Sequence, residues 1–168
     1  MESAASVLGY AQRVPTTEVV SLPTGTALPK SMSQDWRVVN VSLAPDGVTT
    51  IDGLPTWNVE GLLAGIATRP SGYKDLPGLA QWLPDAAKQA DISLIIHLLS
   101  TATAPTRQRV AYLLAVGDNS RGSEATLAAY PPQGPAWFGT RSVAGKFNPS
   151  TRVNDTALHP YLQVGAGS

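Results

Sequence analysis

The sequence lacks cysteine altogether, carries few charged side chains and has no net charge. Without cysteine, disulfides, thiol nucleophiles, cysteine-ligated zinc modules and iron–sulfur clusters are excluded. Charged residues make up only 14% of the chain, against about 25% in an average soluble domain. The 12 Lys and Arg residues balance the 12 Asp and Glu residues. No overall field therefore draws the chain to nucleic acid or to an anionic membrane.

Long apolar runs are also missing. The longest, at residues 94–99, is far shorter than the ~20 residues that cross a bilayer. The N-terminus lacks the basic-then-apolar layout of a secretory signal, and we expect a cytoplasmic protein. At 168 residues, the chain is long enough for one ordinary domain whose hydrophobic core is stable without disulfide cross-links.

The first third of the chain favours short strands. Gly9 suits the left-handed position that ends a helix, and Asp52-Gly53 is a tight-turn signal between two β-type runs. We therefore expect an opening helix, followed by strands of which the last two form a hairpin. The expected elements are a helix at 2–8 and strands at 18–22, 36–43, 48–51 and 54–56.

From residue 56 the hydrophobic period becomes helical. Thr56 or Asn58 is placed to cap a first helix, and Asp75 and Asp91 are placed to cap the next two. The run at 93–99 also fits a strand, because short apolar runs do not settle their period. The expected helices end at Pro70, lie between Asp75 and Pro84, and cover 92–101 (apolar nearly all round and thus buried), 104–116 and 120–129.

After Pro131-Pro132 the chain returns to short β-leaning segments separated by glycine and proline. The order predicts an α+β fold, with β-rich segments at both ends around a central set of about five helices. We expect one domain over 1–168. Its expected parts are a β-rich segment at 1–56, a helical one at 57–130 and a β-leaning tail at 131–168.

Catalytic and cofactor motifs are not evident. His97 lies on an apolar helix face and is interpreted as a buried core histidine, and His159 as part of a chain-end turn. The sequence contains no Gly-x-Ser-x-Gly elbow, phosphate loop or dinucleotide-binding glycine motif. Gly61 and Gly65, four apart on a helix, favour close packing. We expect no enzyme, metal or cofactor; a small hydrolase or toxin that uses His97 with a carboxylate stays an alternative.

The charges are unevenly distributed. Residues 1–105 carry six cations and nine acids, whereas residues 106–168 carry six cations and three acids. Arg107 and Arg109 flank the leucine stripe of the 104–116 helix, and Tyr112 is expected opposite it, exposed as an interface anchor. Glutamate at both arginine positions is expected to weaken binding without unfolding. The candidate contacts to DNA phosphates or to a partner protein, with solubilising charges as the alternative, are Arg107, Arg109, Tyr112, Arg121, Arg141, Lys146 and Arg152.

Several segments resemble one known family. The opening 2–10 (ESAASVLGY) leads through a proline into the strand at 18–23 (EVVSLP), and 48–56 (VTTIDGLPT) precedes a leucine-rich helix. Residues 109–114 (RVAYLL) look like that family's Arg-x-x-Tyr-Leu-Leu helix, and the tail with Asn148-Pro149 and Asn154-Asp155 fits its closing β-segment. The chain thus resembles the AbiEi family of type IV antitoxins over nearly its whole length.

The resemblance implies an antitoxin and transcriptional regulator of a bacterial toxin–antitoxin, or abortive-infection, system. Members join an N-terminal winged-helix DNA-binding domain to a C-terminal α/β domain, repress their own operon and counter a nucleotidyltransferase toxin of the AbiEii type. Set against these members, the sequence is expected to correspond to the second domain without the winged helix, either as part of a longer protein or as a short form. The implied partners are operator DNA and the toxin, without a membrane. The alternative is an auxiliary DNA-binding domain of a transcription factor.

Overall fold

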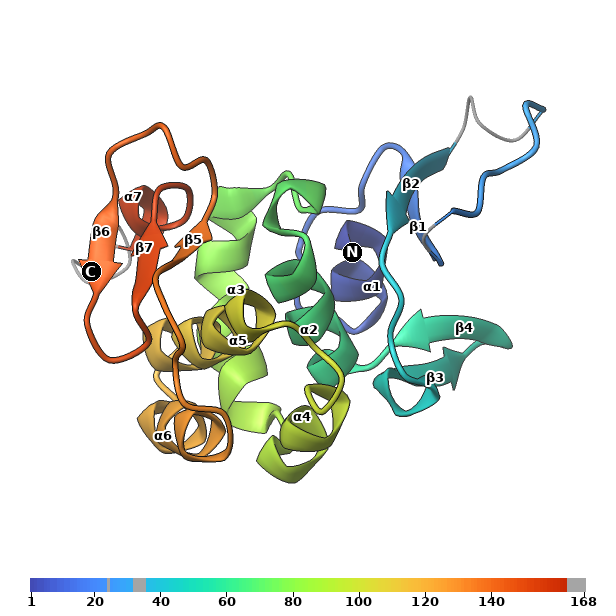
Figure 1. Cartoon of the computed structure of the whole chain (residues 1–168). Helices are drawn as coiled ribbons and strands as arrows, with labels where there is room; N and C mark the ends of the chain where they lie inside the picture. The colour runs from blue at the N-terminus through green and yellow to red at the C-terminus, as the bar shows by residue number, and fades with distance from the viewer. Residues whose placement is uncertain (24, 32–35, 163–168) are drawn as a thin grey trace.

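The computed structural model describes residues 1–23, 25–31 and 36–162, and it confirms the α+β fold (Figure 1). Strands gather at both ends of the chain, with helices between them. The strands are β1 (Glu18–Leu22), β2 (Trp36–Asn40), β3 (Val48–Ile51), β4 (Leu54–Trp57), β5 (Ala136–Phe138), β6 (Lys146–Asn148) and β7 (Val153–Asp155). The last six residues of the expected β-leaning tail, 163–168, lie outside the described residues.

The helices fall largely where their caps and periods predict. Two short 3-10 turns, η1 (Pro45–Gly47) and η2 (Pro70–Gly72), flank α2. The α-helices are α1 (Glu2–Val7), α2 (Val59–Thr68), α3 (Leu76–Gln89), α4 (Ile92–Leu98), α5 (Ala104–Val116), α6 (Ser120–Ala129) and α7 (His159–Leu162).

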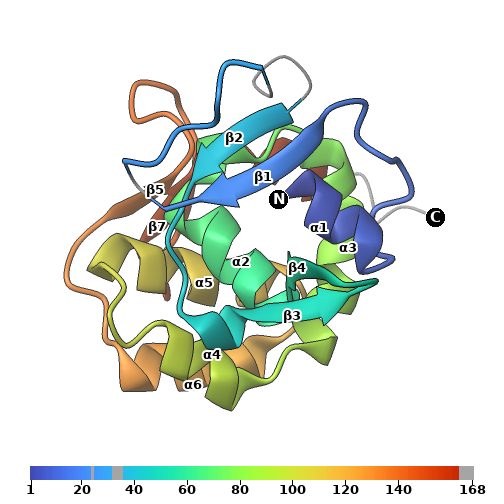
Figure 2. The ribbon, with the colours of Figure 1, turned by 90° about the vertical axis from the view of Figure 1, so that its right-hand side faces the viewer.

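The β-segments lie on two opposite sides of the helices (Figure 1). On one side, β1 pairs in parallel with β2, and β3 forms an antiparallel hairpin with β4 (Figure 2). The expected Asp52-Gly53 turn closes the hairpin with both residues at positive φ, 49° and 78°. On the other side, the three-stranded sheet has the order β5-β7-β6, with β5 parallel and β6 antiparallel to β7.

Helix α5 occupies the centre of the molecule. Its Val110, Leu113 and Leu114 are fully buried, as the predicted stripe requires. The helix packs against α2, α3 and α6, and also against β5 and β7. It therefore connects the helical core to the C-terminal sheet.

Two glycines allow α2 to approach its neighbours closely, as the sequence predicts. Asn58 caps the helix by accepting a 2.8 Å hydrogen bond from the Gly61 N–H. A Cβ at Gly61 would lie 2.0 Å from the Gly47 carbonyl oxygen, and one at Gly65 would lie 2.3 Å from the Trp57 ring. Any larger residue would push η1 or β4 away from the helix.

Two helix predictions were wrong in extent. Helix α3 does not stop before Pro84 but continues to Gln89, because Ala86 and Ala87 are fully buried in the core. That packing outweighs the roughly 3 kcal/mol cost of an internal proline. Helix α4 ends at Leu98 rather than at residue 101, and only one of its faces is buried. It is a helix, which excludes the strand alternative.

Candidate nucleic-acid interface

Arg107, a predicted surface contact, is held by the helix that precedes it. Its Nε donates to the Leu99 carbonyl at 2.9 Å and its Nη2 to the Ser100 carbonyl at 2.6 Å. Its guanidinium also lies 4.2 Å from the centroid of the Tyr130 ring. Arg107 therefore satisfies carbonyl groups at the end of α4, where a cation also complements the helix dipole.

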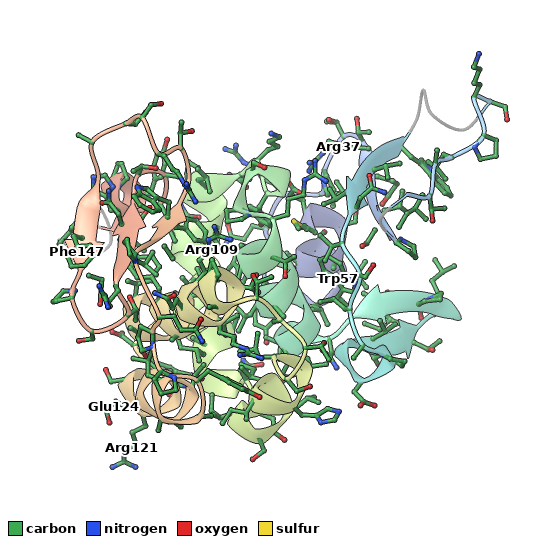
Figure 3. All side chains as sticks on the ribbon, viewed as in Figure 1. Arg37, Trp57, Arg109, Arg121, Glu124 and Phe147 are labelled. Carbon is green, nitrogen blue, oxygen red and sulfur yellow. The ribbon has the colours of Figure 1, made fainter. Side chains whose placement is uncertain are left out.

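Arg109 is tied to two elements at once. Its Nε donates to the Trp137 carbonyl at 2.6 Å, and its Nη1 donates to the Ala67 carbonyl at 3.0 Å. Figure 3 shows it between the helices and the C-terminal sheet. Burial, together with the nearby Arg141 charge, lowers the pKa of Arg109. The guanidinium thus joins the end of α2 to β5, so glutamate at this position should destabilise the fold, contrary to the sequence-based expectation.

The predicted exposure of Tyr112 was wrong, because its side chain is only 3% exposed. Its hydroxyl donates to Asp155 Oδ2 at 2.5 Å. The other carboxylate oxygen, Oδ1, accepts from the N–H groups of Ala157 and Leu158 at 2.9 and 2.7 Å. The C-terminal sheet covers the face of α5 that the leucine stripe leaves free. Tyr112 is therefore a structural anchor for this sheet.

Gln108, which sequence reasoning missed, belongs to the same contact. It is almost completely buried, and its Nε2 donates to the carbonyls of Gly134 and Thr151 at 2.7 and 3.0 Å. A glutamine between two arginines looks like part of a solvated helix face. Its partners lie in the segments that lead into β5 and β7, far along the chain.

Buried phenols make the fold sensitive to alkaline pH. Burial raises the pKa of Tyr73 and that of Tyr112 above 10.0, with the Asp155 charge adding to the effect at Tyr112. The native state then keeps both protons where the unfolded chain loses them, so stability falls as pH rises above about 10, by up to ~1.4 kcal/mol per pH unit for each phenol. Urea titrations from about pH 8 to pH 11 should show that the free energy of unfolding falls less steeply with pH in Tyr73→Phe and Tyr112→Phe than in the wild type.

Tyr161→Phe, which changes an exposed phenol, controls for the substitution itself. Slopes equal to that of the wild type in both buried-site variants would contradict this prediction.

The remaining candidate cations, Arg121, Arg141, Lys146 and Arg152, are exposed. Arg121 projects from α6 beside Glu124 (Figure 3). The other three belong to the C-terminal sheet and its loops. The only acidic residue from position 131 onward is Asp155, which is fully buried. The solvent-facing charges of this sheet are therefore all positive, which suits a polyanion.

The predicted burial of His97 was also wrong. Its side chain is 63% exposed, and its Nε2 lies 3.0 Å from Asp46 Oδ2 on the open surface. A groove of about 410 Å³ lies elsewhere, between the segment that follows α1 and α3, and Tyr10, Trp82 and Asp85 are among its lining residues. The hydrolase alternative thus gains a His–Asp pair, but neither residue lines this groove.

Two searches of the described part of the chain were negative. No three histidine, aspartate or glutamate side chains come together there in a way that would hold a metal ion. Within residues 1–23, 25–31 and 36–162, no helix is both long and apolar enough to cross a membrane.

Helices between two β-groups, with one sheet presenting only positive charge to solvent, define the chain as an α+β domain with a surface suited to binding. The comparison with protein families is more specific. The family model of the AbiEi antitoxin C-terminal domain matches residues 1–116, and the chain belongs to this family. The predicted resemblance is thereby confirmed from α1 to the end of α5. The family is a regulatory, non-enzymatic kind of domain, which supports a role in toxin–antitoxin regulation.

A solved structure extends the likeness beyond residue 116. The chain is similar to the crystal structure of the RV2827C protein from Mycobacterium tuberculosis, with a TM-score of 0.85 and 26% identity. The alignment covers 97% of this chain and 63% of that one, so the chain spans less than two thirds of that protein's length. No curated protein matches the chain.

Proposed function

We propose that this domain counters a nucleotidyltransferase toxin of a type IV toxin–antitoxin system and supports autoregulation of its operon. The observation that carries the proposal is the match to the AbiEi antitoxin C-terminal domain. Growth of cells that express the cognate toxin tests it directly. Co-expression of this chain should restore growth, and continued arrest at equal toxin levels would contradict the antitoxin role.

The proposed contact with operator DNA rests on the charges of the C-terminal sheet. Arg141, Lys146 and Arg152 are exposed there, and the only acid of that region is buried. Arginine and lysine bind DNA mainly through phosphates, which positions a protein on a duplex without reading its sequence. We assign Arg107, Arg109 and Tyr112 to the fold instead, since their polar groups already bind within the chain.

Replacing Arg141, Lys146 and Arg152 together by glutamate should weaken binding to duplex DNA from the upstream region at least tenfold. If each cation contacts one phosphate, the slope of log K against log salt should fall by about 2.7, or about 0.9 for each lost contact. Size-exclusion chromatography and anisotropy titrations at low and moderate salt measure both quantities.

The matched control replaces three exposed cations of the first 105 residues, Arg13, Lys74 and Lys88, by glutamate and changes the net charge equally. Equal weakening in the two variants would reduce the effect to net charge, and no binding at either salt would remove DNA from the proposal. Duplex binding without rescue of growth would favour the alternative of an auxiliary DNA-binding domain.

A further inference from the structure

The outer face of the C-terminal sheet presents a row of side chains that neither the helices nor the core uses. In the strand register, Trp137 of β5 and Phe147 of β6 both lie opposite Asn154 of the central strand β7. Paired residues of adjacent strands point to the same side of a sheet. Their neighbours Phe138, Val153 and Asp155 are fully buried against α5, so the row faces away from the core.

Both rings of this row are accessible to different degrees. Phe147 is 53% exposed, and Trp137 is partly exposed with the Arg141 guanidinium 4.7 Å from the centroid of its ring. Figure 3 places Phe147 on the side of the sheet away from the helices. Two strand spacings separate the two rings, about 9 to 10 Å. Planar groups bound to the two rings would therefore be separate units.

The neighbouring row of the same face is small. A Cβ at Gly139 would lie 2.5 Å from Thr156 Oγ1, and one at Gly145 would lie 2.7 Å from Thr156 Cγ2. Larger residues at either glycine would clash with the threonine, so no large side chain projects from the sheet beside the aromatic row. Trp137 and Phe147 are left as its projecting groups.

We infer that this outer face, the row Trp137–Asn154–Phe147 with Arg141 and Arg152, binds single-stranded nucleic acid by stacking, with exposed Lys146 on the edge strand β6 beside it. Bases stack on Phe147 and on the Trp137–Arg141 pair, while the cations contact phosphates. The Asn154 amide lies between the two rings, where it can donate and accept hydrogen bonds at a base edge.

The chemistry of the face selects this ligand over two others. A duplex hides the faces of its bases, so phosphate contacts alone would leave Phe147 unused. An apolar protein surface would be expected to meet few charges at the centre of its contact, whereas here Arg141 and Arg152 accompany the exposed ring and Lys146 lies at the adjoining sheet edge. The inference goes beyond the proposed function, because it concerns a different form of nucleic acid.

Anisotropy titrations with labelled single strands of about ten nucleotides test the inference. The full chain is titrated with a uridine oligomer, a thymidine oligomer and a duplex of the same length. Phe147→Ala should weaken single-strand binding about 5- to 100-fold, and Phe147→Trp should preserve it. Leu54→Ala, which truncates an exposed leucine on the β3–β4 hairpin, is the control. It should leave the affinity for both single-stranded oligomers unchanged. Tighter binding of either oligomer supports the inference and identifies RNA or DNA as the source.

A second readout reports stacking itself. In a Trp36→Phe background, Trp137 is the accessible tryptophan, because Trp57 and Trp82 are buried. A base stacked beside it should quench its fluorescence in proportion to occupancy. The inference is overturned if neither oligomer binds the wild type, if Phe147→Ala binds as tightly as the wild type, or if binding leaves Trp137 fluorescence unchanged. Binding of a polyglutamate peptide in place of the oligomers would also overturn it. Duplex binding and growth rescue test the proposed function separately.

Discussion

Asp155→Ala should destabilise the protein by about 3 to 5 kcal/mol, because the carboxylate is fully buried and accepts three hydrogen bonds. Alanine would leave the Tyr112 hydroxyl and the N–H groups of Ala157 and Leu158 without their acceptor. Each unsatisfied buried donor costs about 1 to 3 kcal/mol. Removing the carboxylate also removes the cost of burying its charge, which places the expected value toward the lower part of the summed range.

Urea unfolding followed by far-UV circular dichroism measures this loss. Glu124→Ala, which truncates an exposed acid on α6, should change the stability by less than about 0.5 kcal/mol. A double-mutant cycle with Tyr112→Phe isolates the Tyr112–Asp155 hydrogen bond, and we expect a coupling of about 1 to 3 kcal/mol. A loss below about 1 kcal/mol for Asp155→Ala would show that water replaces the carboxylate.

The Asp155 result also separates the fold of the sheet from its binding face. Asp155 and Asn154 are consecutive in β7, but one is buried against α5 and the other faces away from it. A variant on the inner side should lose stability and nucleic-acid binding together. Phe147→Ala, on the outer side, should lose binding alone. Comparing the two assigns a loss of binding either to the contact surface or to unfolding.

Local signals in the sequence account for where helices α2, α3 and α4 begin. Asn58, Asp75 and Asp91 each accept hydrogen bonds from N–H groups within the next three residues, and such caps are visible in the sequence itself. The bounds of α5 were predicted instead from its leucine stripe and from Gly117, which ends the helix. Gly61 and Gly65 predicted that α2 packs closely against its neighbours, which are η1 and β4. These features depend on residues that are neighbours along one helix.

The candidate site depends on contacts between distant segments, and there the sequence was misleading. The opposite face of α5 reads as polar, with Arg109, Gln108 and Tyr112 along it. Its partners lie 26 to 43 residues later in the chain. Two of these partners, Trp137 and Asp155, belong to β5 and β7. All three strands of this sheet are only three residues long, too short for alternation to show which side chain faces the helix. Phe147 was missed for the same reason.

Arg109→Glu should cost about 3 kcal/mol or more of folding stability, although the sequence suggests a harmless surface change. The substitution removes charge-assisted hydrogen bonds to the carbonyls of Trp137 and Ala67, each worth about 1.5 to 3 kcal/mol. It also places a carboxylate against oxygen atoms that it cannot bind. The stability of Arg109→Lys should lie between that of Arg109→Glu and that of the wild type, since an ammonium lacks the forked guanidinium that reaches both acceptors.

Arg121→Glu is the matched control for this substitution, because it changes the charge equally at an exposed position of α6. It should alter the urea midpoint little. If Arg109→Glu lowers the midpoint and nucleic-acid binding in parallel, while Arg121→Glu leaves the midpoint unchanged, Arg109 acts by holding β5 on α2. An unchanged midpoint with weakened binding would instead make Arg109 a direct contact and would show that the sheet holds its place without this arginine. Whether the substitution lowers stability or lowers only binding thus decides between two roles. In the first case Arg109 of α5 holds the C-terminal sheet in place, and in the second it contacts nucleic acid directly.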